Sequence, residues 1–258
     1  MRKSRVAGLV FLATAALAQQ QQSVEITSEP SHHLVFQNEY VRVFDVTVAP
    51  KASTLIHRHN HDYLFVTLGD SDVVSVRPGE EPVSLKLKDG EVRFTPGNFA
   101  HAAINNSDRP FHNTTIELLQ PSTNIKKCTE ACEIPVPCEL GKAACPSIFP
   151  LISSDQWTVL LIKFPPGSRL ESHTRSAPHL FVPVSDLELT RELGSSRRTV
   201  KRASGDVAWI PGGDVSHALT VNNTTHSMLF VTVEFNSGTG SPTRAGVARD
   251  GVEEKAKP

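Results

Sequence analysis

Short apolar segments alternate with turn-forming residues along the first half of the chain. Examples are RVFDVTVAP (42–50), YLFVTLGD (63–70) and VSLKLKDG (83–90), which are rich in β-branched and aromatic residues and end at Pro, Gly or Asp. This composition favours strands bounded by tight turns, and no segment has the 3.6-residue spacing of a helix. We therefore expect an all-β protein, an antiparallel barrel or sandwich, with Trp157 and Trp209 filling its core.

The same pattern occurs twice in the chain. Pro50 and His57 recur 116 residues later as Pro166 and His173, and DGEVRFTPGNFAHAAINN (89–106) resembles SGDVAWIPGGDVSHALTVNN (204–223). Each copy then ends in a strand-like run, HNTTIELL or MLFVTVEF. The repeat predicts two similar domains, residues 32–120 and 148–236. A Cys-rich linker, 121–147, would join them, and a polar, flexible tail, 237–258, would follow.

Three histidines at alternate positions mark the first copy. His57, His59 and His61 lie in LIHRHNHDY, and alternate residues of an extended strand point to the same face. Imidazole is a common ligand of zinc, iron, copper and nickel. The segment therefore indicates a metal site that needs a further ligand from another strand.

The segments around these histidines resemble the two motifs of the cupin superfamily. The first motif is G, five residues, H-x-H, three or four residues, E, six residues, G. It corresponds here to Lys51, His57-Arg58-His59, Tyr63 and Gly69. The second is G, five residues, P-x-G-x-x-H, three residues, N, and corresponds to Gly90, Pro96-Gly97, His101 and Asn105. Both are found twice, so the resemblance implies a bicupin: two double-stranded β-helix (cupin jelly-roll) barrels in tandem. The fold alone does not specify an activity.

The resemblance further implies a metal site in the first barrel. His57, His59 and His101 would bind one divalent ion per chain, iron, manganese, zinc or nickel, and leave positions for water or substrate, as catalytic sites do. Tyr63 stands where the family has a ligating Glu; a neutral Tyr is a poor ligand but a serviceable hydrogen-bond donor. We expect Tyr63 or His61, the candidate catalytic residues, to donate or relay a proton. The alternatives are a rim position or metal ligation for His61 and a barrel that binds no metal.

The second copy departs further from the motifs. His173 matches His57, but Arg175 takes the place of His59 and His179 that of Tyr63. A guanidinium stays protonated and cannot ligate a metal. His217 resembles His101 but follows Pro211 by six residues instead of five, which we expect to turn it out of the cavity. These changes predict a degenerate, structural barrel; the alternatives are a second metal site and an anion held by Arg175.

The first 18 residues predict export. A basic start, MRKSR, is followed by the apolar AGLVFLATAALA and an Ala16-x-Ala18 cleavage site, which is typical of a cleaved secretory signal; an uncleaved anchor is the alternative. We therefore expect a periplasmic or secreted protein. In an oxidising compartment the four clustered cysteines favour two disulfides over a zinc site; they are Cys128, Cys132, Cys138 and Cys145.

Composition narrows the range of functions. The formal net charge is -1 with 39% hydrophobic residues, which gives no reason to expect nucleic acid or, after signal cleavage, a membrane as partner. No nucleophile elbow, P-loop or dinucleotide fingerprint is present. The sequence favours a metal-dependent dioxygenase, isomerase or lyase acting on a small oxygenated molecule. The alternatives are a non-catalytic module that binds a sugar or carboxylate and a structural bicupin; a homo-oligomer is compatible with all three.

Overall fold

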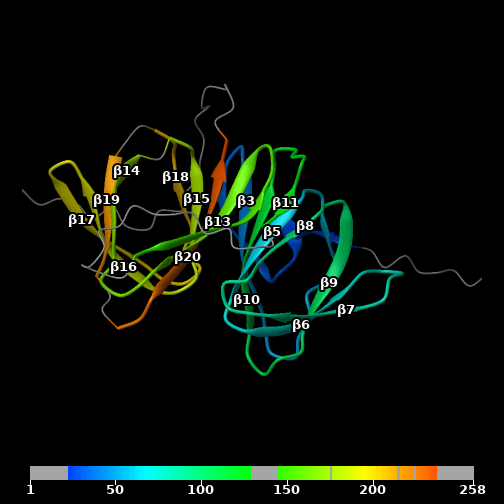
Figure 1. The fold of residues 1–258 in the computed structure, drawn as a ribbon. Helices are drawn as coiled ribbons and strands as arrows, with labels where there is room; N and C mark the ends of the chain where they lie inside the picture. The colour runs from blue at the N-terminus through cyan, green and yellow to red at the C-terminus, as the bar shows by residue number, and fades with distance from the viewer. Residues whose placement is uncertain (1–22, 129–144, 175, 214–215, 223–224, 237–258) are drawn as a thin grey trace, which may run out of the picture.

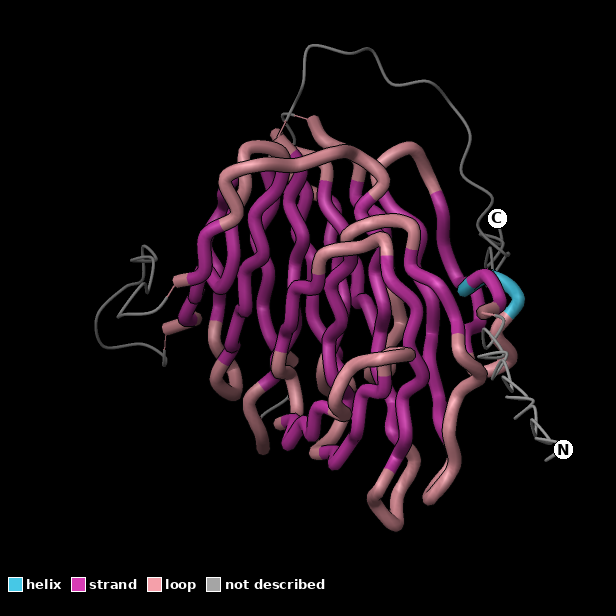
Figure 2. The backbone as a smooth tube through the Cα atoms, turned by 90° about the vertical axis from the view of Figure 1, so that its right-hand side faces the viewer, coloured by secondary structure: helices cyan, strands magenta, loops and turns pink. Residues whose placement is uncertain are grey.

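The protein is built almost entirely from strands. The computed structural model describes residues 23–128, 145–174, 176–213, 216–222 and 225–236. Figures 1 and 2 show strands throughout, with one helical turn, η1 (Ile26–Ser28), at the edge, and every described strand pairing except that of the short β1 with β4 is antiparallel. Within these ranges no helix is long and apolar enough to cross a bilayer. The expected all-β fold class is confirmed.

Residues 24–118 form the first barrel from two five-stranded sheets. One has the order β1-β4-β9-β6-β7 and the other β2-β3-β10-β5-β8. Their bounds are β1 (Val24–Glu25), β2 (His32–Gln37), β3 (Val41–Val48), β4 (His57–His59), β5 (Tyr63–Leu68), β6 (Ser71–Val76), β7 (Val83–Leu87), β8 (Val92–Thr95), β9 (Phe99–Asn105) and β10 (Phe111–Leu118).

The second barrel has the same plan. Its sheets have the orders β11-β12-β13-β20-β15-β18 and β14-β19-β16-β17. The bounds are β11 (Lys126–Lys127), β12 (Ser147–Ser153), β13 (Trp157–Phe164), β14 (Arg169–Thr174), β15 (His179–Pro183), β16 (Leu187–Leu193), β17 (Ser196–Arg202), β18 (Ala208–Ile210), β19 (Ser216–Val221) and β20 (Met228–Phe235). The two tandem barrels predicted from the repeat are therefore present.

Two short strands lie outside the predicted limits of the barrels. β1 pairs in parallel with β4, with Val24 opposite His57, and β11 pairs with β12, with Lys126 opposite Ser153. The expected signal and tail, most of the linker, and Cys132 and Cys138 lie outside the described residues. The described Cys128 and Cys145 are not free thiols, and the expected pairing of the four cysteines stays a prediction.

The largest hydrophobic core lies between the barrels. It combines buried residues of β3, β5 and β10 with residues of β13, β15 and β20, and Figure 1 shows these strands meeting in the middle of the molecule. Trp157 is fully buried there, and Trp209 stacks on Tyr40 of the other barrel at a centroid distance of 5.4 Å. Both tryptophans fill a core, as predicted.

Matching turns of the two copies contact the opposite barrel. A Cβ built on Gly90 would lie 2.9 Å from Leu229, and one on Gly205 would lie 2.9 Å from Leu68. Both glycines have positive φ, 73° and 84°, a conformation that L side chains avoid. The two barrels are therefore joined through reciprocal contacts, and glycine at these positions serves both the turn and the close approach.

A second close approach fixes the strand that carries His101. A Cβ on Gly97 would lie 2.3 Å from the carbonyl carbon of His61. The Gly97 amide donates to Asp62 Oδ1 at 2.8 Å, and the Asn98 amide donates to the His59 carbonyl at 2.7 Å. These hydrogen bonds tie the loop of residues 96–98, which precedes β9, to the end of β4. β9 therefore pairs with β4 in a register that sets His57 opposite His101.

Candidate metal centre

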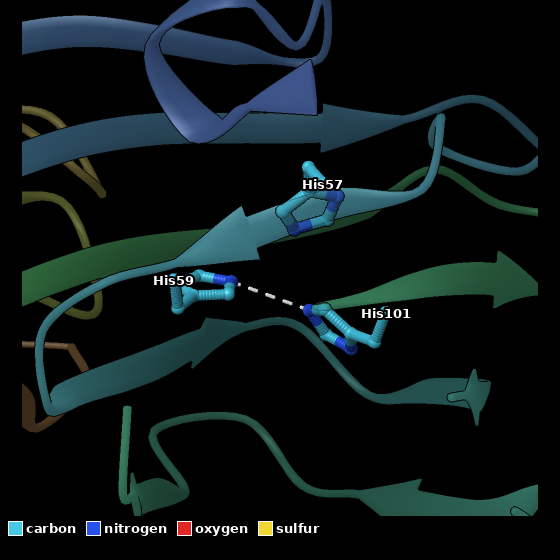
Figure 3. Close-up of side chains that lie close together, drawn as sticks. All are labelled: His57, His59 and His101. Carbon is cyan, nitrogen blue, oxygen red and sulfur yellow. Dashed lines mark hydrogen bonds between the residues drawn. The ribbon is translucent and has the colours of Figure 1, made fainter. Parts of the chain in front are cut away.

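Three histidines from two neighbouring strands converge in the first barrel. His57 and His59 of β4 are each 1% exposed, because both alternate positions of this strand face the interior. His101 of β9 completes the group, and one ring nitrogen of each residue lies within 4.8 Å of the others. The Nε2 atoms of His59 and His101 lie 3.3 Å apart, and Figure 3 marks the hydrogen bond between these two rings. The predicted three residues are therefore brought together.

Hydrogen bonds orient these rings. His57 Nδ1 donates to the Leu55 carbonyl at 2.9 Å, and since a carbonyl only accepts, Nδ1 carries the proton. Nε2 of His57 then presents its lone pair to the interior, where it is buried without a hydrogen-bond partner among the described residues. His101 Nδ1 lies 3.0 Å from Ser75 Oγ, which leaves its Nε2 directed at His59. Outer contacts of this kind are typical of metal-binding histidines.

The imidazoles are neutral at ordinary pH. Burial lowers the pKa of His57 to about 4, with the neighbouring His32 adding to the effect. Burial, together with His57, also lowers the pKa of His101 to about 3. The pKa of His59 is lowered further, again mainly by burial. Neutral imidazole is the form that ligates a metal.

The spacing fits a first-row divalent ion. Metal–nitrogen bonds of about 2.0–2.1 Å place neighbouring ligand atoms about 2.8–3.4 Å apart in octahedral or tetrahedral geometry. The His59–His101 separation of 3.3 Å agrees with this range. Together with the unpartnered Nε2 of His57, it shows that the donor set present can hold such an ion.

A buried carboxylate–histidine pair beside the cluster was not predicted. His32 Nδ1 lies 2.6 Å from Glu29 Oε2, and both side chains are buried. The His32 ring packs against His57 at a centroid distance of 4.5 Å and lines the same cavity. Neither residue lies in the two motifs, so the motif spacing gave no signal for them. A buried Glu three residues before a buried His becomes informative only once β2 is placed in the barrel.

A second buried carboxylate lies behind His59. Glu117 of β10 is fully buried, with Oε1 3.9 Å from His59 Nδ1 and Oε2 2.9 Å from Arg42 Nε. Burial raises its pKa to about 7 although the Arg42 charge opposes the shift. The residue was not singled out in the sequence, where it is one charged position in the apolar run HNTTIELL.

Of the two predicted catalytic residues, Tyr63 is buried beside the histidines, whereas His61 is partly exposed and does not line the cavity. Tyr63 is 5% exposed and stacks on His59 at a centroid distance of 4.0 Å. Burial raises its pKa to about 12, opposed by a hydrogen bond with Thr95, so its hydroxyl remains a donor. His61 is partly exposed in the turn after β4 and is absent from the described residues that line the cavity. The catalytic roles of both residues stay predictions.

The histidines line a cavity of about 650 Å³ in the first barrel. Its wall combines apolar and polar residues, and the Arg77 guanidinium lies 3.8 Å from the centroid of the Phe99 ring within it. The exposed Glu80 and Glu81 also line it. Its size and the polar groups that converge in it are typical of a small-molecule site.

The second barrel preserves part of the arrangement. β14 pairs with β19 so that His173 lies opposite His217, and the two rings are 4.5 Å apart. Both line a cavity of about 490 Å³ with His179. The expectation that His217 turns away from the cavity was wrong: the register of β14 and β19 restores its position. Arg175 lies outside the described residues. Among those described, only the group in the first barrel brings three potential metal ligands together.

No protein-family model and no curated protein matches the chain. Several solved structures match the chain. AerE from Microcystis aeruginosa has a TM-score of 0.55 at 10% identity, over 81% of this chain and 99% of that one. Oxalate decarboxylase from Bacillus subtilis has a TM-score of 0.51 at 13% identity, over 82% and 72% of the two chains. Salicylate 1,2-dioxygenase from Pseudoaminobacter salicylatoxidans has a TM-score of 0.52 at 11% identity, over 76% and 68%. With its two β-barrels in tandem, the chain has the bicupin fold.

Proposed function

We propose that His57, His59 and His101 hold one divalent metal ion, and that the protein is a metal-dependent enzyme acting on a small oxygenated molecule. The observation that carries the proposal is the convergence of three neutral imidazoles on one point of a cavity, with His57 Nε2 lacking a protein partner. Such a donor set leaves further coordination positions for a ligand. A bound ion of this kind supplies Lewis-acid or redox chemistry, which suits a dioxygenase, isomerase or lyase.

The chain's own residues have separate tasks in this proposal. Tyr63, whose hydroxyl keeps its proton because its pKa is about 12, donates a hydrogen bond to a substrate oxygen. Arg77 attracts an anionic group of the substrate, since it lines the same cavity. His61 could serve only as an outer proton relay, because it does not line the cavity.

Two of the solved structures similar to this chain support a small oxygenated acid as the substrate class. Oxalate decarboxylase has Mn(II) centres, and the salicylate dioxygenase forms an adduct with gentisate. Oxalate, salicylate and gentisate are all small oxygenated acids. Identities of 13% and 11% transfer the fold alone, so the metal and the reaction of this chain are left open among iron, manganese, zinc and nickel.

Export is part of the same proposal. The basic and apolar N-terminus with Ala16-x-Ala18 supports a cleaved signal, and the clustered cysteines support an oxidising compartment. Mass determination of the mature protein from a secreting host tests this directly. A chain that begins after Ala18 and contains two disulfides is expected; a full-length reduced chain in the cytoplasm would contradict it.

The central experiment is metal analysis of the protein purified without a His tag. We expect about one equivalent per chain, lost in a His57→Ala plus His101→Ala double variant and retained in His33→Ala, which removes an exposed histidine of β2. Oxygen uptake and turnover are then measured over a panel of hydroxy, keto and aromatic acids. Unchanged metal in the double variant would refute the site. Metal without turnover would favour a non-catalytic binding module over the enzyme.

A further inference from the structure

The cavity of the second barrel differs in charge from that of the first. Arg77, Arg93 and Lys127 line the first cavity together with three carboxylates, those of Glu80, Glu81 and Glu91. The second is lined by Arg191, Arg198 and Arg202, and no carboxylate lines it among the described residues. The rest of its wall is mainly apolar, with Leu170, Phe181 and Phe230 among the contributors. It is therefore a positively charged cavity with a hydrophobic wall.

Strand alternation directs the arginines into this cavity. β16 and β17 are paired so that Arg191 lies directly opposite Arg198, and Leu189 opposite Val200. Alternate residues of a strand share a face, and all four of these residues line the cavity. Like charges opposite each other destabilise a sheet, so the stability of the ladder does not account for the pair.

Charges on the other face of the same strands are paired. Glu192 lies 3.3 Å from Arg197 and 2.9 Å from Arg169, and Glu188 lies 2.8 Å from Lys201. By contrast, Arg191 and Arg198 have no carboxylate within ion-pair distance among the described residues. The solvent-facing charges are neutralised within the protein, whereas the cavity-facing guanidiniums are available to an outside anion.

The internal repeat shows what Arg191 replaces. A shift of 116 residues relates His173 to His57, His217 to His101 and Arg191 to Ser75. The strand registers agree, since Ser75 pairs with Ala103 and Arg191 with Leu219. In the first barrel Ser75 is a neutral partner of a histidine. In the second, a fixed positive charge at the equivalent position disfavours a bound cation and favours an anion.

We propose that the second barrel binds a small carboxylic acid with an apolar body. Arg191 and Arg198 hold the carboxylate, and the chain or ring of the ligand packs against Leu170, Phe181 and Phe230. A guanidinium recognises a carboxylate through parallel charge-assisted hydrogen bonds, and a cavity of about 490 Å³ lies within the usual size of small-molecule sites. This site is separate from the proposed metal centre, and neither depends on the other.

Calorimetric titration of the full-length protein with octanoate and benzoate tests the proposal, with 1-octanol as the uncharged counterpart of octanoate. At least one acid should bind at one site per chain, and octanol should bind at least tenfold more weakly. Arg191→Ser, which installs the residue of the first barrel, should weaken acid binding about tenfold to a hundredfold. Arg198→Gln should act in the same direction. Arg197→Gln, one residue along the strand and on the opposite face, is the matched control and should leave binding unchanged.

Thermal unfolding of each variant separates loss of binding from loss of folding. Undiminished binding by both folded variants Arg191→Ser and Arg198→Gln would overturn the proposal, as would equal binding of octanol and octanoate, or no binding of either acid. A metal ion that survives His57→Ala plus His101→Ala but is lost on His173→Ala would also overturn it, because the second cavity would then be a cation site. Failure of the metal centre in the first barrel would leave all of these outcomes unaffected.

Discussion

The Nε2 atoms of His59 and His101 lie 3.3 Å apart although the residues are 42 positions apart in the sequence. This contact is a single hydrogen bond between two neutral rings, and a divalent ion bound by both nitrogens would replace it with two coordination bonds. Metal binding should therefore stabilise the folded protein.

We expect chelator treatment to lower the free energy of unfolding by about 3 kcal/mol where the free metal is at about 100 times its dissociation constant. Thermal unfolding with and without metal measures this. The His57→Ala plus His101→Ala variant should show no metal-dependent shift, and a shift equal to that of the wild type would contradict the assignment.

Metal retention should extend to unusually low pH. The pKa of His57 is about 4 and that of His101 about 3, against about 6.5 for an exposed histidine. A lowered pKa keeps the imidazole neutral, so protons compete with the metal only well below neutrality. Occupancy measured by metal analysis after dialysis should stay constant from about pH 7.5 to about pH 5.5. Release with a midpoint near 6.5 would show that the ligands titrate as exposed histidines.

His32→Ala should weaken metal binding without removing a ligand. The substitution deletes the ring that packs on His57 and removes the imidazole 2.6 Å from the buried Glu29 carboxylate, which keeps only backbone amide donors. We expect about a tenfold loss of metal affinity and a loss of about 1–3 kcal/mol of stability. Competition with a chromogenic chelator measures the affinity. His33→Ala, on the exposed side of the same strand, should change neither quantity.

Gly97→Ala should disturb the site through the backbone. Its Cβ would lie 2.3 Å from a main-chain carbon of His61, so the loop must move away from β4 at a cost of about 1–3 kcal/mol or more. Gly69→Ala is the comparison: its Cβ meets open space and incurs only the strain of a φ of 86°, about 1–2 kcal/mol. Gly97→Ala should reduce metal content, whereas Gly69→Ala should not. Normal metal content in Gly97→Ala would show that the loop does not set the register.

Glu117 should make the metal-free protein less stable as the pH rises. Its pKa in the folded protein is about 7, against 4.5 for the unperturbed group. Between these values the folded state holds a proton that the unfolded state has lost, so the stabilising contribution is present at low pH and declines towards pH 7. The slope is at most about 1.4 kcal/mol per pH unit. Denaturant unfolding at about pH 5 and about pH 7 should show a weaker decline in Glu117→Gln; an identical decline would assign the effect to other groups.

Local pattern and internal repetition determined much of the site. The resemblance to the cupin motifs around His57, His59 and His101 was sufficient to predict that these residues meet, because it implies a barrel in which alternate strand positions point inward. Lys51 is a further example: it stands where the motif has Gly, and its φ of 58° matches the 67° of Gly167 in the second copy. The position retains the turn although its side chain has changed.

Only the tertiary structure decided which other side chains surround the histidines. His32 and Glu117 come from strands outside the motifs and Glu29 from the segment between η1 and β2, and their partners depend on how the two sheets close. The same holds for His217, which the additional residue after Pro211 seemed to exclude and the pairing of β14 with β19 restores. The sequence by itself determined the strands and the duplication, because these follow from local periodicity and spacing, and its resemblance to the cupin motifs predicted that the three histidines meet. The neighbours of those histidines and the charge of the second cavity required the fold, because long-range packing sets them.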